Sequence, residues 1–206
     1  MDQSTLTNIQ RTLLEQIGVA KIADEFYLAG GTALALHLAH RRSEDFDFFS
    51  SIAFDAQEKD RTIAKAFPRT PILVEKQTVI ATISGIQISF MYYPYPLLQE
   101  TVILDSSLAV ASIEDICTMK LSTIAARGAK RDFLDLYFIC ASQFPLSQAI
   151  DLYEKRFRGA AADRYHLLRS LTYFADAEED PMPRLQRSIE WKTARNFFVS
   201  EARKLL

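Results

Sequence analysis

Residues 26–49, with the sequence FYLAGGTALALHLAHRRSEDFDFF, decide the fold that this chain predicts. The apolar run 26–29 predicts a short buried strand. Gly30 and Gly31 follow it as a turn, where a missing Cβ lets the backbone approach a ligand closely. Thr32 then opens a run of helix formers, so unpaired N–H groups at a helix N-terminus would face the turn. The three residues therefore predict a phosphate site built from backbone.

Two acidic residues follow this unit on a predicted strand. Asp45 and Asp47 alternate with Phe46 and Phe48, so the carboxylates share one face of the strand and the rings face the core. Ionising both carboxylates is costly unless a cation lies between them. Oxygen ligands presented beside phosphates suit Mg²⁺, so we expect Asp45 and Asp47 to hold this metal.

Each motif has an ordinary structural explanation when it stands alone. A Gly-Gly pair between a strand and a helix is most often a simple turn, and half-exposed strands commonly alternate acidic and aromatic residues. Their order and close spacing, with a strand and a helix before the acidic strand, favour a nucleotide and metal site.

The stretch from Phe26 through Ser50 resembles the AbiEii/AbiGii toxin family of nucleotidyltransferase-like proteins, and the resemblance covers nearly the whole chain. It implies a polymerase-β-like nucleotidyltransferase fold of the α+β class and Mg²⁺-dependent transfer of a nucleotide from a nucleoside triphosphate. It also implies a toxin role, either beside a separate antitoxin or in phage defence. For parts of this family it implies an RNA acceptor, the 3′ end of tRNA. The other segments that carry the resemblance are 92–98, 111–121, 130–137 and 176–183.

Lys120 and Asp132 are further candidates for the catalytic site. Lys120 lies at the edge of an apolar helical stripe, where an ammonium needs a partner, a ligand or a path to solvent. The resemblance implies that this lysine binds the nucleotide and takes part in catalysis, and that Asp132 is an additional active-site acid. Asp135 is explained instead by an exposed i,i+4 pair with Arg131.

Other charged residues are secondary candidates. His40 and Arg41 could reach a phosphate, although loop residues of these types are more often solvated. The segment from Lys120 to Arg131 carries four cations and no acid, which predicts a local basic surface for a triphosphate. Solvated cations at helix ends are the alternative.

The sequence departs from the family pattern at one point. Polymerase-β-like enzymes usually place a third carboxylate on a neighbouring strand, but residues 86–93 offer only Gln87 and Ser89. Glu75 is the nearest strand acid, and no spacing argument places it at the metal. We therefore expect one Mg²⁺ rather than two.

Periodicity and turn signals predict the remaining elements. Helices and strands mix up to about residue 110, and from residue 112 the pattern is nearly all helical. We expect a nucleotidyltransferase-like α+β lobe over 1–110 and a helical lobe over 111–206 packed against it, with the substrate cleft between them. The predicted helices are 5–18, 32–38, 55–67, 112–127, 130–142, 146–157, 161–174 and 187–205, and the predicted strands are 26–29, 45–49, 72–75, 78–83 and 86–92.

Composition adds weaker constraints. The 206 residues are 49% hydrophobic and carry 24 Lys/Arg against 26 Asp/Glu, so the whole chain gives no electrostatic case for nucleic-acid binding. Cys117 and Cys140 lie in apolar helical patterns and predict buried free thiols. The polar start and the absence of a long apolar run predict a cytoplasmic protein that does not enter a membrane.

Three functions remain open on the sequence. The first is a toxin that adds a nucleotide to RNA. The second keeps the same chemistry with a small molecule or a protein side chain as acceptor. The third is a catalytically silent nucleotidyltransferase fold that binds a partner, for which the missing third acid is the only sequence hint.

Overall fold

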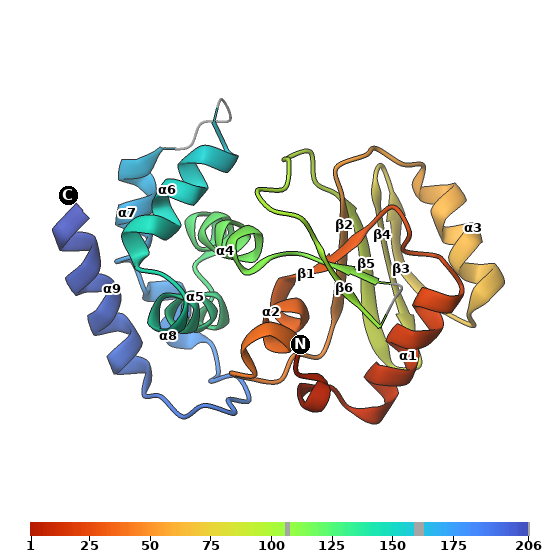
Figure 1. The fold of residues 1–206 in the computed structure, drawn as a ribbon, viewed down its shortest axis with the longest axis horizontal. Coiled ribbons are helices and arrows are strands. Elements are labelled where there is room, and N and C mark those ends of the chain that lie inside the picture. Colours follow the sequence, from red (N-terminus) through yellow and green to blue (C-terminus); the bar gives the residue numbers. More distant parts are fainter. Residues whose placement is uncertain (106–107, 159–162, 206) are drawn as a thin grey trace. The chain divides into compact units, whose positions relative to one another are not determined.

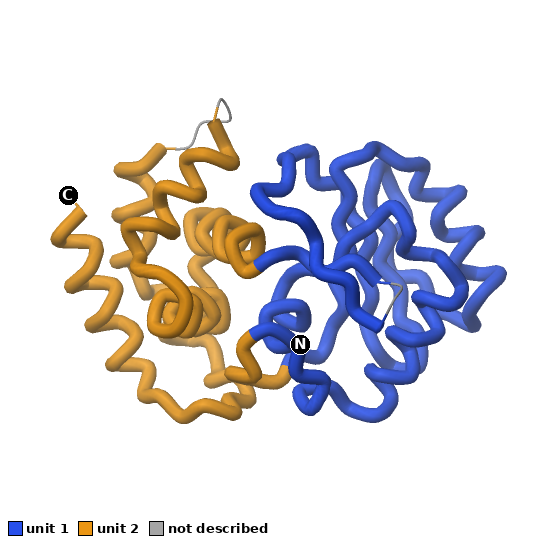
Figure 2. Tube along the Cα trace, viewed as in Figure 1, with its two compact units in different colours: residues 1–37, 43–112 blue, residues 38–42, 113–206 orange. Residues whose placement is uncertain are grey.

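The computed structural model describes residues 1–105, 108–158 and 163–205. The chain divides into two compact units (Figure 2). The first consists of residues 1–37 and 43–112, and the second of residues 38–42 and 113–206. The first unit mixes helices with a sheet and the second is helical, so the predicted α+β class is confirmed.

In the part of the chain that the structure describes, the first unit holds a seven-stranded sheet in the order β3-β4-β5-β2-β1-β7-β6 (Figure 1). Strand β2 pairs antiparallel with β1 and parallel with β5, while β1 pairs parallel with β7. The strands are β1 (Tyr27–Ala29), β2 (Phe46–Ser50), β3 (Thr70–Glu75), β4 (Thr78–Ile83), β5 (Ile86–Tyr92), β6 (Val102–Leu104) and β7 (Leu108–Val110). The helical elements of this unit are η1 (Gln3–Thr5), α1 (Asn8–Val19), α2 (Gly30–Leu38, whose last residue belongs to the second unit) and α3 (Ala56–Ala66).

The two faces of this sheet differ in burial. On β2 the side chains alternate between buried and half-buried, and β4 shows the same alternation. Phe48 stacks on Phe90 of β5 with ring centroids 5.1 Å apart and an interplanar angle of 11°. Helix α3 packs on β3 and β4. One face of the sheet therefore forms the core of the unit, and the other carries the half-buried residues of β2 and β4.

The second unit is built around α4 (Ile113–Arg127), which packs against α5 (Lys130–Ser142), α6 (Leu146–Arg156) and α7 (Arg164–Ser170). Helix α5 also contacts α8 (Ala175–Glu179) and α9 (Trp191–Leu205). Phe133 is fully buried and touches the rings of Phe174, Trp191 and Phe198, with centroids 5.2 to 5.9 Å away. This aromatic cluster holds α5 and α9 together.

Several element boundaries differ from the predicted ones. Helix α1 begins at Asn8 because Thr7 and Gln10 form a capping box that fixes its first turn. Helix α9 begins at Trp191 rather than at residue 187, and the short elements β6, β7 and α8 were not predicted. Residues 161 and 162 of the predicted helix 161–174 lie outside the described residues. The predicted hairpin at Gly85 is confirmed, with Ser84 and Gly85 both at positive φ.

Both cysteines are free thiols, as the sequence predicts; Cys117 is buried, whereas Cys140 is partly exposed. Burial raises the pKa of Cys140 to about 12, so its thiol stays protonated. Among the described residues, none of the helices has the length and apolar character that crossing a bilayer requires.

Candidate active site

The glycine turn and the acidic strand are in direct contact. Gly30 has φ +67°, a left-handed conformation that glycine adopts without a steric penalty. A Cβ on this residue would lie 2.6 Å from Oδ2 of Asp47. Strand pairing sets this approach, because Ala29 stands opposite Asp47 in the antiparallel register of β1 and β2. Gly30 is therefore required both by its backbone angle and by the carboxylate beside it.

Thr32 ties the first turn of α2 to the acidic strand. Its side chain is fully buried, and its hydroxyl donates to the backbone carbonyl of Asp45. The helix begins at Gly30, so all three residues of the motif lie in its first turn. Their backbone N–H groups belong to the set that an α-helix leaves without intrahelical partners. The arrangement is the one that anion sites at helix N-termini use.

The two carboxylates lie on the half-buried face of the sheet. Phe46 and Phe48 are fully buried, whereas Asp47 is half-buried and Asp45, which directly precedes β2, is half-buried as well. The predicted alternation is confirmed. On the neighbouring strand β5, the residue opposite Asp47 is Ser89, so this position supplies a hydroxyl and no charge.

This donor set fits one magnesium ion. Mg²⁺ is usually bound by one or two carboxylates together with substrate phosphates and water, and Asp45 and Asp47 supply two carboxylates beside a backbone anion site. The described residues contain no group of three or more His, Cys, Asp or Glu side chains placed to hold a metal. A site that needs three protein carboxylates is therefore not supported.

Lys120 lies in a buried charge cluster of the second unit. Its side chain is 9% exposed, and its Nζ lies 2.7 Å from Oδ1 of Asp132 and 2.6 Å from Oδ2 of Asp135. Burial alone would lower the pKa of Lys120, but the two carboxylates outweigh it and raise the pKa above its ordinary value. Lys120 is therefore a fixed positive charge at any physiological pH.

Asp135 is the centre of this cluster and was assigned wrongly from the sequence. It is fully buried and accepts from Nε of Arg41 at 2.6 Å, from Nη2 of Arg41 at 2.8 Å and from Nε2 of His40 at 2.8 Å. The exposed pair with Arg131 was an incorrect prediction. Burial would raise the pKa of Asp135, but the charges of Lys120 and Arg41 hold it well below its usual range.

His40 and Arg41 are not solvated loop residues. Their exposed fractions are 0% and 5%, because both side chains point to Asp135. The carbonyl of His40 also accepts from the backbone N–H groups of Gln186 and Arg187, at 2.8 and 3.1 Å. The prediction that these side chains are solvated was wrong because their partners are 94 and 95 residues away along the chain.

The predicted basic surface between Lys120 and Arg131 is reduced to two residues. Lys120 and Lys130 are buried. Nζ of Lys130 binds the backbone carbonyl of Asp180, and the backbone N–H of Lys130 donates to Oδ2 of Asp180 at 2.9 Å. Arg127 and Arg131 are exposed, and Arg127 lies 3.2 Å from Asp132. Three of the four cations in this segment therefore bind groups of the protein itself: Lys120 and Arg127 bind carboxylates, and Lys130 binds backbone carbonyls.

The structure gathers the predicted site residues into one group in each unit. Gly30, Gly31, Thr32, Asp45 and Asp47 come together in the first unit. In the second unit Lys120 and Asp132 come together, with Asp135 as the member that sequence analysis missed. A signal for Asp135 was present, since it interrupts the apolar helical run 133–139 in which no face is polar enough to expose an acid.

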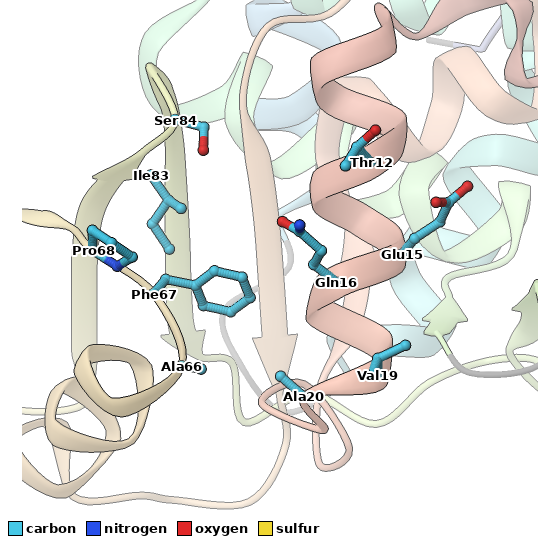
Figure 3. A pocket seen from close by; sticks show the side chains of 10 residues that line it. All are labelled: Thr12, Glu15, Gln16, Val19, Ala20, Ala66, Phe67, Pro68, Ile83 and Ser84. Atoms are coloured by element: carbon cyan, nitrogen blue, oxygen red, sulfur yellow. The ribbon is translucent and has the colours of Figure 1, made fainter.

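A hollow of about 830 Å³ lies in the first unit (Figure 3). It is lined by α1, by the end of α3 with Phe67 and Pro68, and by Ile83 and Ser84 at the β4–β5 turn. None of its lining residues belongs to either group of predicted site residues, so the sequence motifs give it no role.

Comparisons with known proteins agree with the motifs. Residues 12–204 match the family model described as the nucleotidyl transferase AbiEii toxin of a type IV toxin–antitoxin system. An uncharacterized protein of Aquifex aeolicus (strain VF5) is 36% identical over 203 residues, which is 96% of each chain.

Solved structures show the same fold at low sequence identity. A crystal structure of an H. pylori protein assigned as a nucleotidyltransferase has a TM-score of 0.57 at 20% identity, covering 97% of this chain and 96% of the other. MenT4, a nucleotidyltransferase toxin from Mycobacterium tuberculosis H37Rv, has a TM-score of 0.57 at 16% identity, covering 94% of this chain and 84% of the other. The polymerase-β-like nucleotidyltransferase fold that the sequence predicts is thereby supported.

Proposed function

Because the chain belongs to the nucleotidyl transferase AbiEii toxin family and is a nucleotidyltransferase, we propose that it transfers a nucleotide from a nucleoside triphosphate to the 3′ end of an RNA, with tRNA as the first candidate. In this proposal Mg²⁺ is the cofactor and a separate antitoxin is the partner. The observation that carries it is the approach of Gly30 to Asp47, which joins a backbone anion site to a carboxylate pair.

The first unit binds and orients the triphosphate. The backbone N–H groups of Gly30, Gly31 and Thr32 hold the β- and γ-phosphates at the N-terminus of α2. Asp45 and Asp47 would hold Mg²⁺, and the Thr32 hydroxyl ties the helix N-terminus to the acidic strand. When bound, Mg²⁺ supplies positive charge at the phosphate oxygens and a template for the reacting groups.

The bond change is an in-line displacement at phosphorus. A hydroxyl oxygen of the acceptor attacks the α-phosphorus, the bond from that phosphorus to the bridging oxygen breaks, and pyrophosphate leaves with the electron pair. We assign to Lys120 the neutralisation of charge that develops on the phosphates. Its two carboxylate neighbours keep it protonated for this role.

We assign to Asp132 the positioning and deprotonation of the acceptor hydroxyl. One of its oxygens binds Lys120 at 2.7 Å and the other binds Arg127 at 3.2 Å, so the carboxylate is held in one orientation. A carboxylate fixed in this way can position the attacking hydroxyl and take its proton.

The test is transfer of label from each of the four α-labelled nucleoside triphosphates into the RNA, protein and small-molecule fractions of a cell extract, with Mg²⁺. The wild type is compared with Asp45→Asn and Asp47→Asn, and with Asp55→Asn as a matched control. Asp55 caps α3 through the N–H of Glu58, and asparagine caps equally well.

Label in RNA that needs Asp45 and Asp47 but not Asp55 is the expected result. Label in the protein or small-molecule fraction would mean that the acceptor is a protein or a small molecule and that the nucleotidyl-transfer chemistry is unchanged. No label in any fraction from a folded protein would favour the catalytically silent alternative, for which the uncharged Ser89 opposite Asp47 is the structural argument.

A further inference from the structure

The chain as a whole is nearly neutral, but its two units have net charges of opposite sign. The first unit has 7 Lys/Arg and 13 Asp/Glu, which gives 7 minus 13, or −6. The second has 17 Lys/Arg and 13 Asp/Glu, which gives 17 minus 13, or +4. Four of its acids, Asp115, Asp132, Asp135 and Asp180, are buried or partly buried and bind buried cations or backbone. The helical unit therefore has the electrostatics that polyanion binding requires, although the whole chain does not.

Three arginines are brought together at one place on this unit by backbone pairing. Arg41 and Leu185 form an isolated antiparallel bridge, and the N–H of Arg42 donates to the carbonyl of Arg184 at 2.9 Å. The N–H of Arg187 donates to the carbonyl of His40 at 3.1 Å. The side chains of Arg42, Arg184 and Arg187 are all exposed, and we name these three residues the arginine patch.

The composition of the patch favours an anionic ligand. Arg42 stands opposite Arg184 next to the bridge, and like charges at facing positions of paired strands are destabilising. Within the described part of the chain, neither Arg42 nor Arg187 forms an ion pair through its side chain. The planar guanidinium fork of arginine also matches phosphate oxygens in pairs, which a lysine does not.

The patch is next to the charge cluster that holds Lys120. Arg41 lies between His40 and Arg42, and its side chain binds Asp135, which in turn binds Lys120. Arg42 is exposed, whereas Arg41 beside it is buried against Asp135. Arg42 therefore directly follows a residue that is linked to the candidate catalytic lysine through Asp135.

We propose that the arginine patch binds the phosphodiester backbone of the RNA acceptor, upstream of the 3′ hydroxyl that reacts. This inference rests on the proposed nucleotidyl transfer and assigns the acceptor class of that same site. A small-molecule acceptor without phosphates gives the patch nothing to bind, so the two acceptor classes make different predictions for it.

The experiment uses the full chain and a 12-nucleotide single-stranded RNA with a free 3′ hydroxyl, with binding followed by fluorescence anisotropy between 50 and 200 mM salt. The test variant is Arg42→Ala/Arg187→Ala, which keeps the backbone bonds of the bridge. The matched control is Arg158→Ala/Arg203→Ala, which removes two exposed arginines elsewhere on the same unit. The variant Arg42→Lys/Arg187→Lys keeps the charge and loses the fork.

Loss of two phosphate contacts should reduce the slope of log K against log salt by about 1.4 for single-stranded RNA. We expect the KM for the RNA to rise roughly tenfold with little change in kcat, because each lost contact is charge-assisted and remote from the reacting phosphorus. The lysine variant should keep the wild-type slope, and the control should match the wild type in slope and KM.

An unchanged slope in Arg42→Ala/Arg187→Ala, or an equal loss in the control, would overturn the proposal, as would a wild type that does not bind the RNA. Binding of the nucleoside triphosphate without RNA is measured in parallel on every variant. If the triphosphate binds and label passes to a small molecule or a protein, the patch proposal fails and nucleotidyl transfer stands. If neither binding nor transfer occurs, the proposed function itself fails.

Discussion

Replacing Asp135 with asparagine tests whether the buried charge cluster is necessary for the stability of the second unit. The carboxylate of Asp135 receives two contacts from Arg41, one from His40 and one from Lys120, all between 2.6 and 2.8 Å. The asparagine amide keeps one acceptor oxygen and turns an N–H₂ donor toward a cationic donor. Removing one partner of a buried pair costs about 3–5 kcal/mol, so we expect a loss of this size in the free energy of unfolding.

The chain has a single tryptophan, and it reports on this unit. Trp191 packs against Phe133 with ring centroids 5.9 Å apart, so its fluorescence during urea unfolding follows the second unit directly. Asp151→Asn is the matched control, because Asp151 has a side chain that is 72% exposed and a pair with Arg164 at 3.8 Å. We expect the control to stay within about 0.5 kcal/mol of the wild type.

The stabilisation that Asp135 contributes to the folded protein should decrease at low pH. Its pKa in the folded protein is well below the ordinary value of 3.8, so the folded state binds fewer protons than the unfolded state in this range. The stabilisation is complete above the unfolded pKa and is lost as pH falls through the folded pKa. The difference between wild type and Asp135→Asn should be full at pH 7 and shrink below about pH 4. A difference below about 1 kcal/mol at pH 7 would refute the assigned role.

Two further predictions concern the first unit. Gly30→Ala should lower the free energy of unfolding by about 2 kcal/mol or more and abolish triphosphate binding, because the new Cβ would lie 2.6 Å from Oδ2 of Asp47 on a backbone with φ +67°. Urea unfolding and calorimetric binding of the triphosphate test this. A variant that binds the triphosphate normally would contradict it. Burial lowers the pKa of the Lys59 ammonium to about 8. The signal of this lysine should therefore titrate near pH 8 in a ¹³C NMR spectrum of lysine-labelled protein, and the variant Lys59→Arg assigns that signal. Because the folded pKa lies below the unfolded value of 10.5, the wild type should gain stability relative to Lys59→Met as the pH rises from 8 to 10.5. A signal titrating near 10.5 would be evidence against the half-buried position of this ammonium.

The elements that sequence analysis placed well are those with local signals. Strands β4 and β5 occur at the predicted residues because their alternation runs over six or seven positions and Gly85 supplies the turn. Strands β6 and β7 have three residues each, which is too short for any period to show. Their place in the sheet depends on pairing with each other and, for β7, with β1, which is information that a local pattern does not contain.

The candidate site divides in the same way. The glycine turn and the acidic strand are 13 residues apart at the Thr32–Asp45 contact, so spacing and periodicity suffice to bring them together. Two partners of Asp135, His40 and Arg41, are 95 and 94 residues away, and neither helical period nor charge pairing along α5 could identify them. The i,i+4 rule suggested a surface pair with Arg131 instead, because that rule describes exposed helices and α5 is buried at this position.

The measurement that tests nucleotidyl transfer most directly is a single incubation of the purified protein with tRNA, α-labelled nucleoside triphosphate and Mg²⁺, repeated with Asp47→Asn. Alkaline hydrolysis of the labelled RNA then moves the labelled phosphate to the nucleotide that preceded the addition. The predicted result is label joined to the original 3′-terminal nucleotide of the tRNA, present with the wild type and lost with Asp47→Asn. Label that persists unchanged in Asp47→Asn, or a wild type that labels no tRNA, would contradict it.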